Sequence, residues 1–186
     1  MADLYKEQLE KAGKFHGDIC GGIISGTKLA MYGLEQLGMD VNKKNKNLMV
    51  FLEIDRCMSD AVQAVTGCSL GRRSLKLNNY GKFAATFYDI STGKAIRISD
   101  KEDDNFNPIE ETTEEKIERY ANTLGKDLFK IQEVEVDIDE NELPGKPRDK
   151  AICSVCNERI MDGKQEIIEG KILCKSCLDK PYYKII

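Results

Sequence analysis

The fold is organised around one stretch of sequence, Leu48-Met-Val-Phe-Leu-Glu-Ile54 followed by Asp55-Arg-Cys-Met-Ser-Asp-Ala-Val-Gln-Ala-Val-Thr-Gly-Cys-Ser-Leu-Gly-Arg-Arg73. The first seven residues are almost all apolar, which predicts a central strand. The strand leads Cys57 to the start of a short helix, for which Ser59 is the expected N-cap and Gly67 the end. Because the unpaired N–H groups at a helix start favour a thiolate, Cys57 is a candidate nucleophile or metal ligand.

Two more residues of this stretch are candidates for chemistry. Asp60, in the first turn of the predicted helix, is a proton-handling neighbour for Cys57. Cys68 follows the helix in a glycine-rich turn, where the backbone can approach a ligand closely. A helix of about eight residues is ~12 Å long, so the two cysteines cannot share one metal unless the turn at residues 66–67 folds back. The alternative is that both are small buried side chains, because free cysteine is among the most buried residue types.

Upstream of this stretch, a helix is predicted from about residue 3 to residue 11, and a long apolar-periodic helix from residue 22 to residue 37. Between them lies the one histidine of the chain, His16, four residues before Cys20. If that turn is helical, the two side chains share a face and can hold one metal. With Cys57 they form the most compact candidate set for a second metal site. The alternative is a histidine that serves packing alone.

The remaining pattern predicts a mainly antiparallel sheet with helices packed against it, which is an α+β fold. Thr112 and Glu115 have the spacing of a capping box, and Gly125 is the expected end of the helix that follows. The charged run at residues 100–104 is expected to be a solvated loop. Besides the central strand, the strands are expected at residues 75–77, 83–90, 94–98 and 134–138.

The least ambiguous pattern is Cys153-x2-Cys156, seventeen residues, then Cys174-x2-Cys177. Four thiolates in two such pairs specify a tetrahedral structural site, for which zinc is favoured and iron is the alternative. A proline-containing linker at residues 141–150 precedes it. The sequence therefore predicts a core domain at residues 1–140, the linker, and a zinc-binding domain at residues 151–186.

Composition limits the classes of function. The chain has 186 residues, of which 41% are hydrophobic and 32% charged, and no apolar run approaches the ~20 residues that cross a bilayer. No signal peptide is visible, so the seven cysteines are expected in a reducing cytoplasm. The formal net charge of −4 disfavours binding to nucleic acid. We expect a soluble cytoplasmic protein that does not bind a membrane.

Three motifs in order resemble the FmdE family, which takes its name from an accessory component of formylmethanofuran dehydrogenase. They are Phe15-His-Gly-x2-Cys-Gly-Gly-x3-Gly-x-Lys-x-Ala30, Asp55-Arg-Cys-x2-Asp-Ala-Val-Gln-x-Val-Thr-Gly-Cys-Ser-Leu-Gly71 and Tyr80-Gly-Lys-x-Ala84. The resemblance covers about residues 10–140, and a C-terminal treble-clef-like zinc finger is an arrangement that some members share. Asp18 stands where the family motif has a second histidine. The resemblance implies a shared cleft lined by His16, Cys20, Cys57, Asp60, Cys68 and Lys82, with Cys68 and Lys82 as cofactor contacts.

The parent enzyme of this family is a molybdenum or tungsten complex that reduces carbon dioxide onto methanofuran, and the FmdE component is not its catalytic core. Two function classes follow. In the first, Cys57 is a thiolate ligand or nucleophile in thiol, metal or one-carbon redox chemistry, with His16 or Asp60 handling the proton. In the second, the protein is a non-enzymatic adaptor or metal- and cofactor-handling protein, whose zinc finger docks a partner such as a molybdenum or tungsten enzyme.

A homodimer that exchanges its C-terminal zinc domains is also expected. The linker is long enough to reach another chain, and an isolated finger would expose apolar side chains that call for a partner surface. The resemblance implies a dimer as well. The apolar side chains that an isolated finger would expose are Ile167, Ile168, Ile172, Leu173 and the Tyr182–Ile186 tail.

Overall fold

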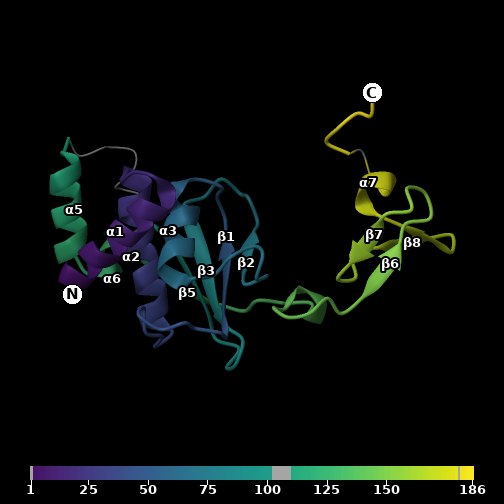
Figure 1. Cartoon of the computed structure of the whole chain (residues 1–186). Coiled ribbons are helices and arrows are strands. Elements are labelled where there is room, and N and C mark those ends of the chain that lie inside the picture. Colours follow the sequence, from purple (N-terminus) through teal and green to yellow (C-terminus); the bar gives the residue numbers. More distant parts are fainter. Residues whose placement is uncertain (1, 102–109, 180) are drawn as a thin grey trace. The chain divides into compact units, whose positions relative to one another are not determined.

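A computed structural model describes residues 2–101, 110–179 and 181–186 (Figure 1). The chain divides into two compact units, residues 1–136 and residues 137–186. Each unit has its own sheets. The N-terminal unit is a mixed α+β structure, and the C-terminal unit carries the four-cysteine group, so the predicted fold class is confirmed.

One five-stranded sheet forms the centre of the N-terminal unit, with the strand order β2-β1-β3-β4-β5. β1 pairs in parallel with β2 and antiparallel with β3, and the remaining pairs are antiparallel. The apolar run after residue 47 is next to the middle of the sheet, as its composition predicted. The strands are β1 (Leu48–Leu52), β2 (Leu75–Leu77), β3 (Ala84–Asp89), β4 (Ala95–Asp100) and β5 (Phe129–Val134).

Helices cover one face of this sheet (Figure 1). α2 packs against α1 and α3 and reaches β3 and β4, so it is the central helix of the unit. Gly33 of α2 lies over the ring of Phe87, where a Cβ atom would come within 2.5 Å of ring carbons. The absence of a side chain at this position therefore lets the helix lie close to the sheet. The helices are α1 (Ala2–His16), α2 (Gly21–Gln36), α3 (Cys57–Thr66), α5 (Thr113–Asn122) and α6 (Gly125–Leu128).

Two helix boundaries differ from the predicted ones. α1 continues through Gly13 to His16 instead of ending at residue 11, because Gly13 is buried and the side chain of Ile19 packs where its Cβ would be. α3 begins two residues before the predicted cap: Arg56 is its N-cap, and Ser59 lies inside the first turn. The consequence is that Cys57 is the first residue of the helix.

The second half of the unit also differs from the prediction. The capping box of Thr112 and Glu115 is present, but α5 ends at Asn122, and Gly125 begins the short helix α6. β5 precedes the predicted strand at residues 134–138, because its partner β4 ends its pairing at Val134. Asp100 belongs to β4, and most of the predicted charged loop, residues 102–104, lies outside the described residues.

The C-terminal unit is built from short pieces. Two small antiparallel hairpins, β6–β7 and β8–β9, are followed by one helical turn. The second hairpin turns at Glu169 and Gly170, and both have positive φ angles. The elements of the C-terminal unit are η1 (Glu140–Glu142), β6 (Lys150–Ile152), β7 (Arg159–Met161), β8 (Glu166–Ile168), β9 (Lys171–Leu173) and α7 (Lys175–Leu178).

No helix within the described parts of the chain has both the length and the apolar character needed to cross a membrane.

Candidate metal centres

Three potential metal ligands meet in the N-terminal unit. His16 is the last residue of α1, Cys20 is the N-cap of α2, and Cys57 is the first residue of α3. One donor atom from each lies within 4.8 Å of the other two. Cys20 makes no side-chain capping hydrogen bond, so its sulfur is not committed to its own helix. Two sulfurs and one imidazole nitrogen are a donor set that zinc and other borderline metals accept.

The ends of α2 and α3 come together because Gly22 has no side chain. A Cβ atom at this position would lie 3.0 Å from the Cβ of Cys57, and 3.7 Å from its sulfur. A larger residue would therefore push the start of α3 away from Cys20. The helix-to-helix contact that builds the core also brings the two thiols together.

The imidazole of His16 is oriented by a carboxylate. His16 Nδ1 lies 2.8 Å from Asp60 Oδ2, and the Gln63 side-chain amide donates to Asp60 Oδ1 at 3.3 Å. If Nδ1 donates its proton to Asp60, the lone pair of Nε2 is free to accept a metal or a proton, as in histidine ligands held by a carboxylate. Nε2 lies 3.6 Å from Asp18 Oδ1, so a further oxygen donor is near the open side.

The ionisation of Cys57 differs from the expectation for a helix start. Its pKa is raised, first by the hydrogen bond with Cys20 and then by burial. The backbone N–H at the helix start does lower the pKa of Cys57, as expected, but this effect is smaller. Without a cation between them, the two sulfurs thus resist simultaneous ionisation. The sequence could not show this, because it depends on the position of Cys20.

Cys68, another predicted site residue, lies beyond the opposite end of α3 from Cys57. Cys68 is buried after the far end of α3, and its thiol donates to the carbonyl oxygen of Leu48 at 3.6 Å. Lys82 is exposed, and its ammonium lies 5.9 Å from the centre of the Tyr80 ring. The N–H of Lys82 donates to the carbonyl oxygen of Glu53, the residue that follows β1. This hydrogen bond fixes the loop that carries Lys82 to the segment that leads from β1 to Cys57.

Sequence reasoning missed Gln63. It lies one helical turn after Asp60 and holds the carboxylate from the side opposite His16. The available indications were its i, i+3 spacing from Asp60 on a predicted helix and its place in the second family motif.

Four sulfurs meet in the C-terminal unit. The sulfurs of Cys153, Cys156, Cys174 and Cys177 lie within 4.8 Å of one another, and Cys156 Sγ is 3.8 Å from Cys174 Sγ. Backbone N–H groups of Cys156 and Cys174 lower the pKa of Cys153 to about 6, whereas the sulfur of Cys174 raises the pKa of Cys177 to about 12. A divalent cation removes this conflict, because it stabilises all four as thiolates. The donor set fits a structural zinc ion.

Two of the comparisons with known proteins cover more than half of the chain. A family model described as "FmdE, Molybdenum formylmethanofuran dehydrogenase operon" matches residues 15–138. A crystal structure of a tungsten formylmethanofuran dehydrogenase FmdE-like protein from Syntrophus aciditrophicus matches with a TM-score of 0.65 and 24% identity. The match covers 97% of this chain and 95% of that protein, and at this identity it shows a shared fold.

Two further comparisons concern parts of the chain. A model described as "Prokaryotic dksA/traR C4-type zinc finger" matches residues 148–183. A protein of Archaeoglobus fulgidus, named "Probable S-adenosyl-L-methionine-binding protein", is 31% identical over 93 residues. That match covers 48% of this chain and a quarter of the relative's length.

The two family models account for the two units in turn. The C-terminal match agrees with the four-sulfur group, and the unit is a C4-type zinc finger. The N-terminal match covers well over half of the chain and contains His16, Cys20 and Cys57, the three candidate ligands. The chain therefore belongs to the FmdE family.

Proposed function

We propose that the N-terminal unit binds one divalent metal ion through His16, Cys20 and Cys57, and that this centre serves thiol- or metal-dependent one-carbon redox chemistry. The proposal is carried by the donor atoms of three separate segments, which lie within 4.8 Å of one another. Structural zinc sites use four protein ligands, whereas catalytic sites use three and keep one position for substrate or water. Because it has three protein ligands, the proposed second metal site is of the catalytic type.

The residues around the ligands have distinct roles in this proposal. Asp60 fixes the imidazole of His16 so that Nε2 faces the metal, and Gln63 fixes Asp60. Asp18, whose side chain is 75% exposed, is close enough to compete for the open position or to exchange protons there. When bound, a metal such as zinc supplies Lewis acidity toward a carbonyl or carboxyl oxygen. Association with a formylmethanofuran dehydrogenase-type enzyme is proposed on the basis of the family description.

Elemental analysis of protein purified without added metal tests the site. We expect two metal ions per chain in the wild type and one in the Cys57→Ala variant, because the finger keeps its zinc. The Cys68→Ala variant is the matched control, since this thiol lies outside both groups, and it should keep both ions. One ion per chain in the wild type would refute the second centre. Equal loss in both variants would point to general destabilisation instead.

A second candidate function, that of an adaptor, is supported by the surface of the finger. Ile167 is 68% exposed and Ile168 46% exposed, on a unit that buries few apolar side chains of its own. Such side chains favour a partner surface. Separately from the adaptor role, we propose a homodimer in which the zinc domains are exchanged, so that a second copy of the chain covers apolar side chains of the finger.

Light scattering tests the exchange. A mass near the 21.0 kDa of one chain refutes the dimer, and twice that mass supports it. If the double mass survives deletion of residues 149–186, the dimer stands but exchange is not its cause. In either case the metal content of the N-terminal unit is a separate measurement, so the proposed metal centre and the proposed dimer can fail independently.

A further inference from the structure

A cavity of about 650 Å³ lies beside the second half of α2. The metal ligands gather at the start of the same helix, roughly 15 Å away by the rise of the helix, so the cavity is not part of the metal centre. Its volume is in the range of sites that bind small molecules and cofactors. Apolar side chains form most of its wall, namely Leu4, Met31, Leu34, Met39, Val41 and Leu124.

One lysine in this wall forms no ion pair with an acidic side chain of the described residues. Lys28 lines the cavity, with its ammonium 5.4 Å from the centre of the Tyr5 ring. Within the part of the chain that the structure describes, this ammonium donates no hydrogen bond and forms no ion pair. Burial lowers the pKa of Lys28, which reflects the cost of keeping a charge in this environment. An anion in the cavity would stabilise it.

The acidic groups nearby do not take this role. Asp40 accepts a hydrogen bond from the N–H of Asn42 at 2.9 Å and lies 3.2 Å from the ammonium of Lys43. Glu35 is two helical turns from Lys28 and forms no ion pair with it among the described residues, although its charge does raise the pKa of Lys28 slightly against the effect of burial. Lys126, Glu35 and Asp40 also line the cavity, so with Lys28 two cations and two carboxylates border it.

We propose that this cavity binds a small molecule with an apolar body and one anionic head group, a carboxylate or a sulfonate. The head group pairs with Lys28, and the body occupies the apolar wall, where two methionine side chains adapt to its shape. The site is independent of the proposed metal centre.

The test uses two fluorescent probes of similar aromatic shape, the anionic 8-anilinonaphthalene-1-sulfonate and the neutral N-phenyl-1-naphthylamine. In folded full-length protein we expect each to bind once per chain. Lys28→Met should weaken binding of the sulfonate by about tenfold and leave the neutral probe within about twofold, because one partly buried ion pair is lost. Lys11→Met, which changes an exposed lysine outside the wall, should alter neither. Met39→Trp should reduce binding of both probes, because it fills the cavity.

Displacement then defines the head group. Decanoate should displace the sulfonate probe, whereas decan-1-ol, which lacks the charge, should do so at least about tenfold less well. Each variant is first checked for a cooperative thermal transition, because the probes also bind partly folded chains. Equal affinity of Lys28→Met and the wild type for the sulfonate overturns the proposal. So does a stoichiometry of one probe for two chains, which would place the cavity at a dimer interface.

Discussion

The two units of this chain are stabilised in different ways. In the N-terminal unit, buried apolar side chains from five helices and the sheet form one cluster. In the C-terminal unit, Cys153 and Ile160 are the buried residues among those that the structure describes, and one of these is a metal ligand. A unit of this size cannot offset its loss of conformational entropy with so little burial, so metal binding must supply its folding free energy.

The same difference applies to the two groups of ligands. His16, Cys20 and Cys57 are held by the ends of three helices, which the core positions without a metal. The cysteines of the finger lie beside two hairpins of short strands and one helical turn, whose arrangement depends on the metal itself. We therefore infer that the first group is preorganised for exchangeable chemistry, whereas the second is purely structural.

The largest expected effect comes from breaking the finger alone. Cys174→Ser should release its zinc, and amide hydrogens at residues 150–178 should then exchange as in an unfolded chain, because the metal supplies the folding free energy. Hydrogen exchange with mass spectrometry measures this in the full chain. Ser176→Ala is the matched control, since it removes the hydroxyl 3.1 Å from Cys174 Sγ and keeps all four ligands. Protection that persists in Cys174→Ser would contradict the role of the metal.

The finger was also the part that the sequence predicted best. Two Cys-x2-Cys pairs encode a local geometry, and the capping box of Thr112 and Glu115 does so as well, so both were recognised without tertiary information. The strand β5 was misplaced because the clean alternation at residues 134–138 is a stronger local pattern than the two apolar residues, Phe129 and Ile131, that precede it. Its position is decided by pairing with β4, which is a long-range effect.

The candidate site shows the same division. The sequence placed Cys57 at a helix start and gave the compact set with His16 and Cys20, because both arguments need only local spacing. It could not give the raised pKa of Cys57, which arises from a sulfur that is 37 residues away along the chain (57 − 20). Gln63 was missed for a similar reason. The role of its side-chain amide can be recognised only once Asp60 is known to bind the imidazole of His16.

The second largest effect should break the N-terminal unit alone. Phe87 is fully buried against Gly33, so Phe87→Ala removes a large side chain from a close-packed contact and should lower the free energy of unfolding by about 3–5 kcal/mol. Urea denaturation followed by circular dichroism measures it. Phe51→Ala is the control, because this half-buried ring alternates with the core-facing residues of β1 and should cost less. Loss of zinc from the finger in Phe87→Ala would show that the two units are not independent.

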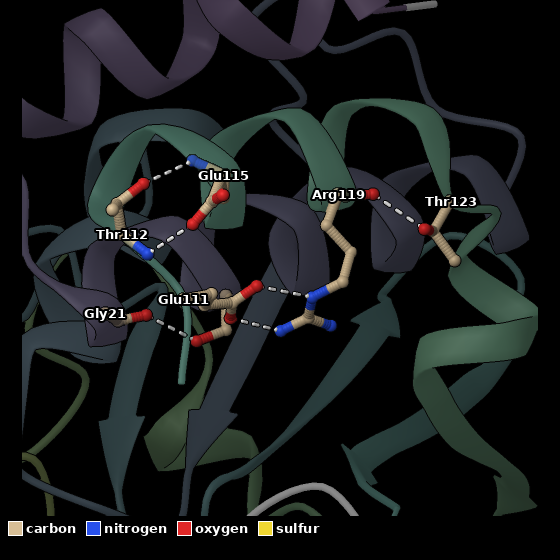
Figure 2. Close-up of polar contacts among 7 residues, drawn as sticks. Gly21, Glu111, Thr112, Glu115, Arg119 and Thr123 are labelled. Atoms are coloured by element: carbon tan, nitrogen blue, oxygen red, sulfur yellow. Dashed lines mark hydrogen bonds and ion pairs between the residues drawn. The ribbon is translucent and has the colours of Figure 1, made fainter. Parts of the chain in front are cut away.

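The smallest expected effect concerns a single polar contact within the N-terminal unit, which is stabilised mainly by apolar burial. Glu111 accepts hydrogen bonds from Nε and Nη2 of Arg119 at 2.9 and 2.7 Å, beside the capping box of α5 (Figure 2). This pairing holds the pKa of Glu111 below its usual value. The Glu111→Gln variant should therefore lose about 1–2 kcal/mol of stability at neutral pH, well below the expected effect of Phe87→Ala.

The dependence of this loss on pH follows from the direction of the shift. Because the pKa of Glu111 is lower in the folded chain than in the unfolded chain, its contribution is fully present above the unfolded pKa and is lost as pH falls through the folded pKa. The difference between the wild type and Glu111→Gln should accordingly shrink in acid. Glu10→Gln is the matched control: Lys14 also lowers the pKa of Glu10, but that ion pair is exposed and should matter less at every pH. A difference for Glu111→Gln that stays constant from neutral to acidic pH would mean that shape, and not charge, is what Glu111 contributes to α5.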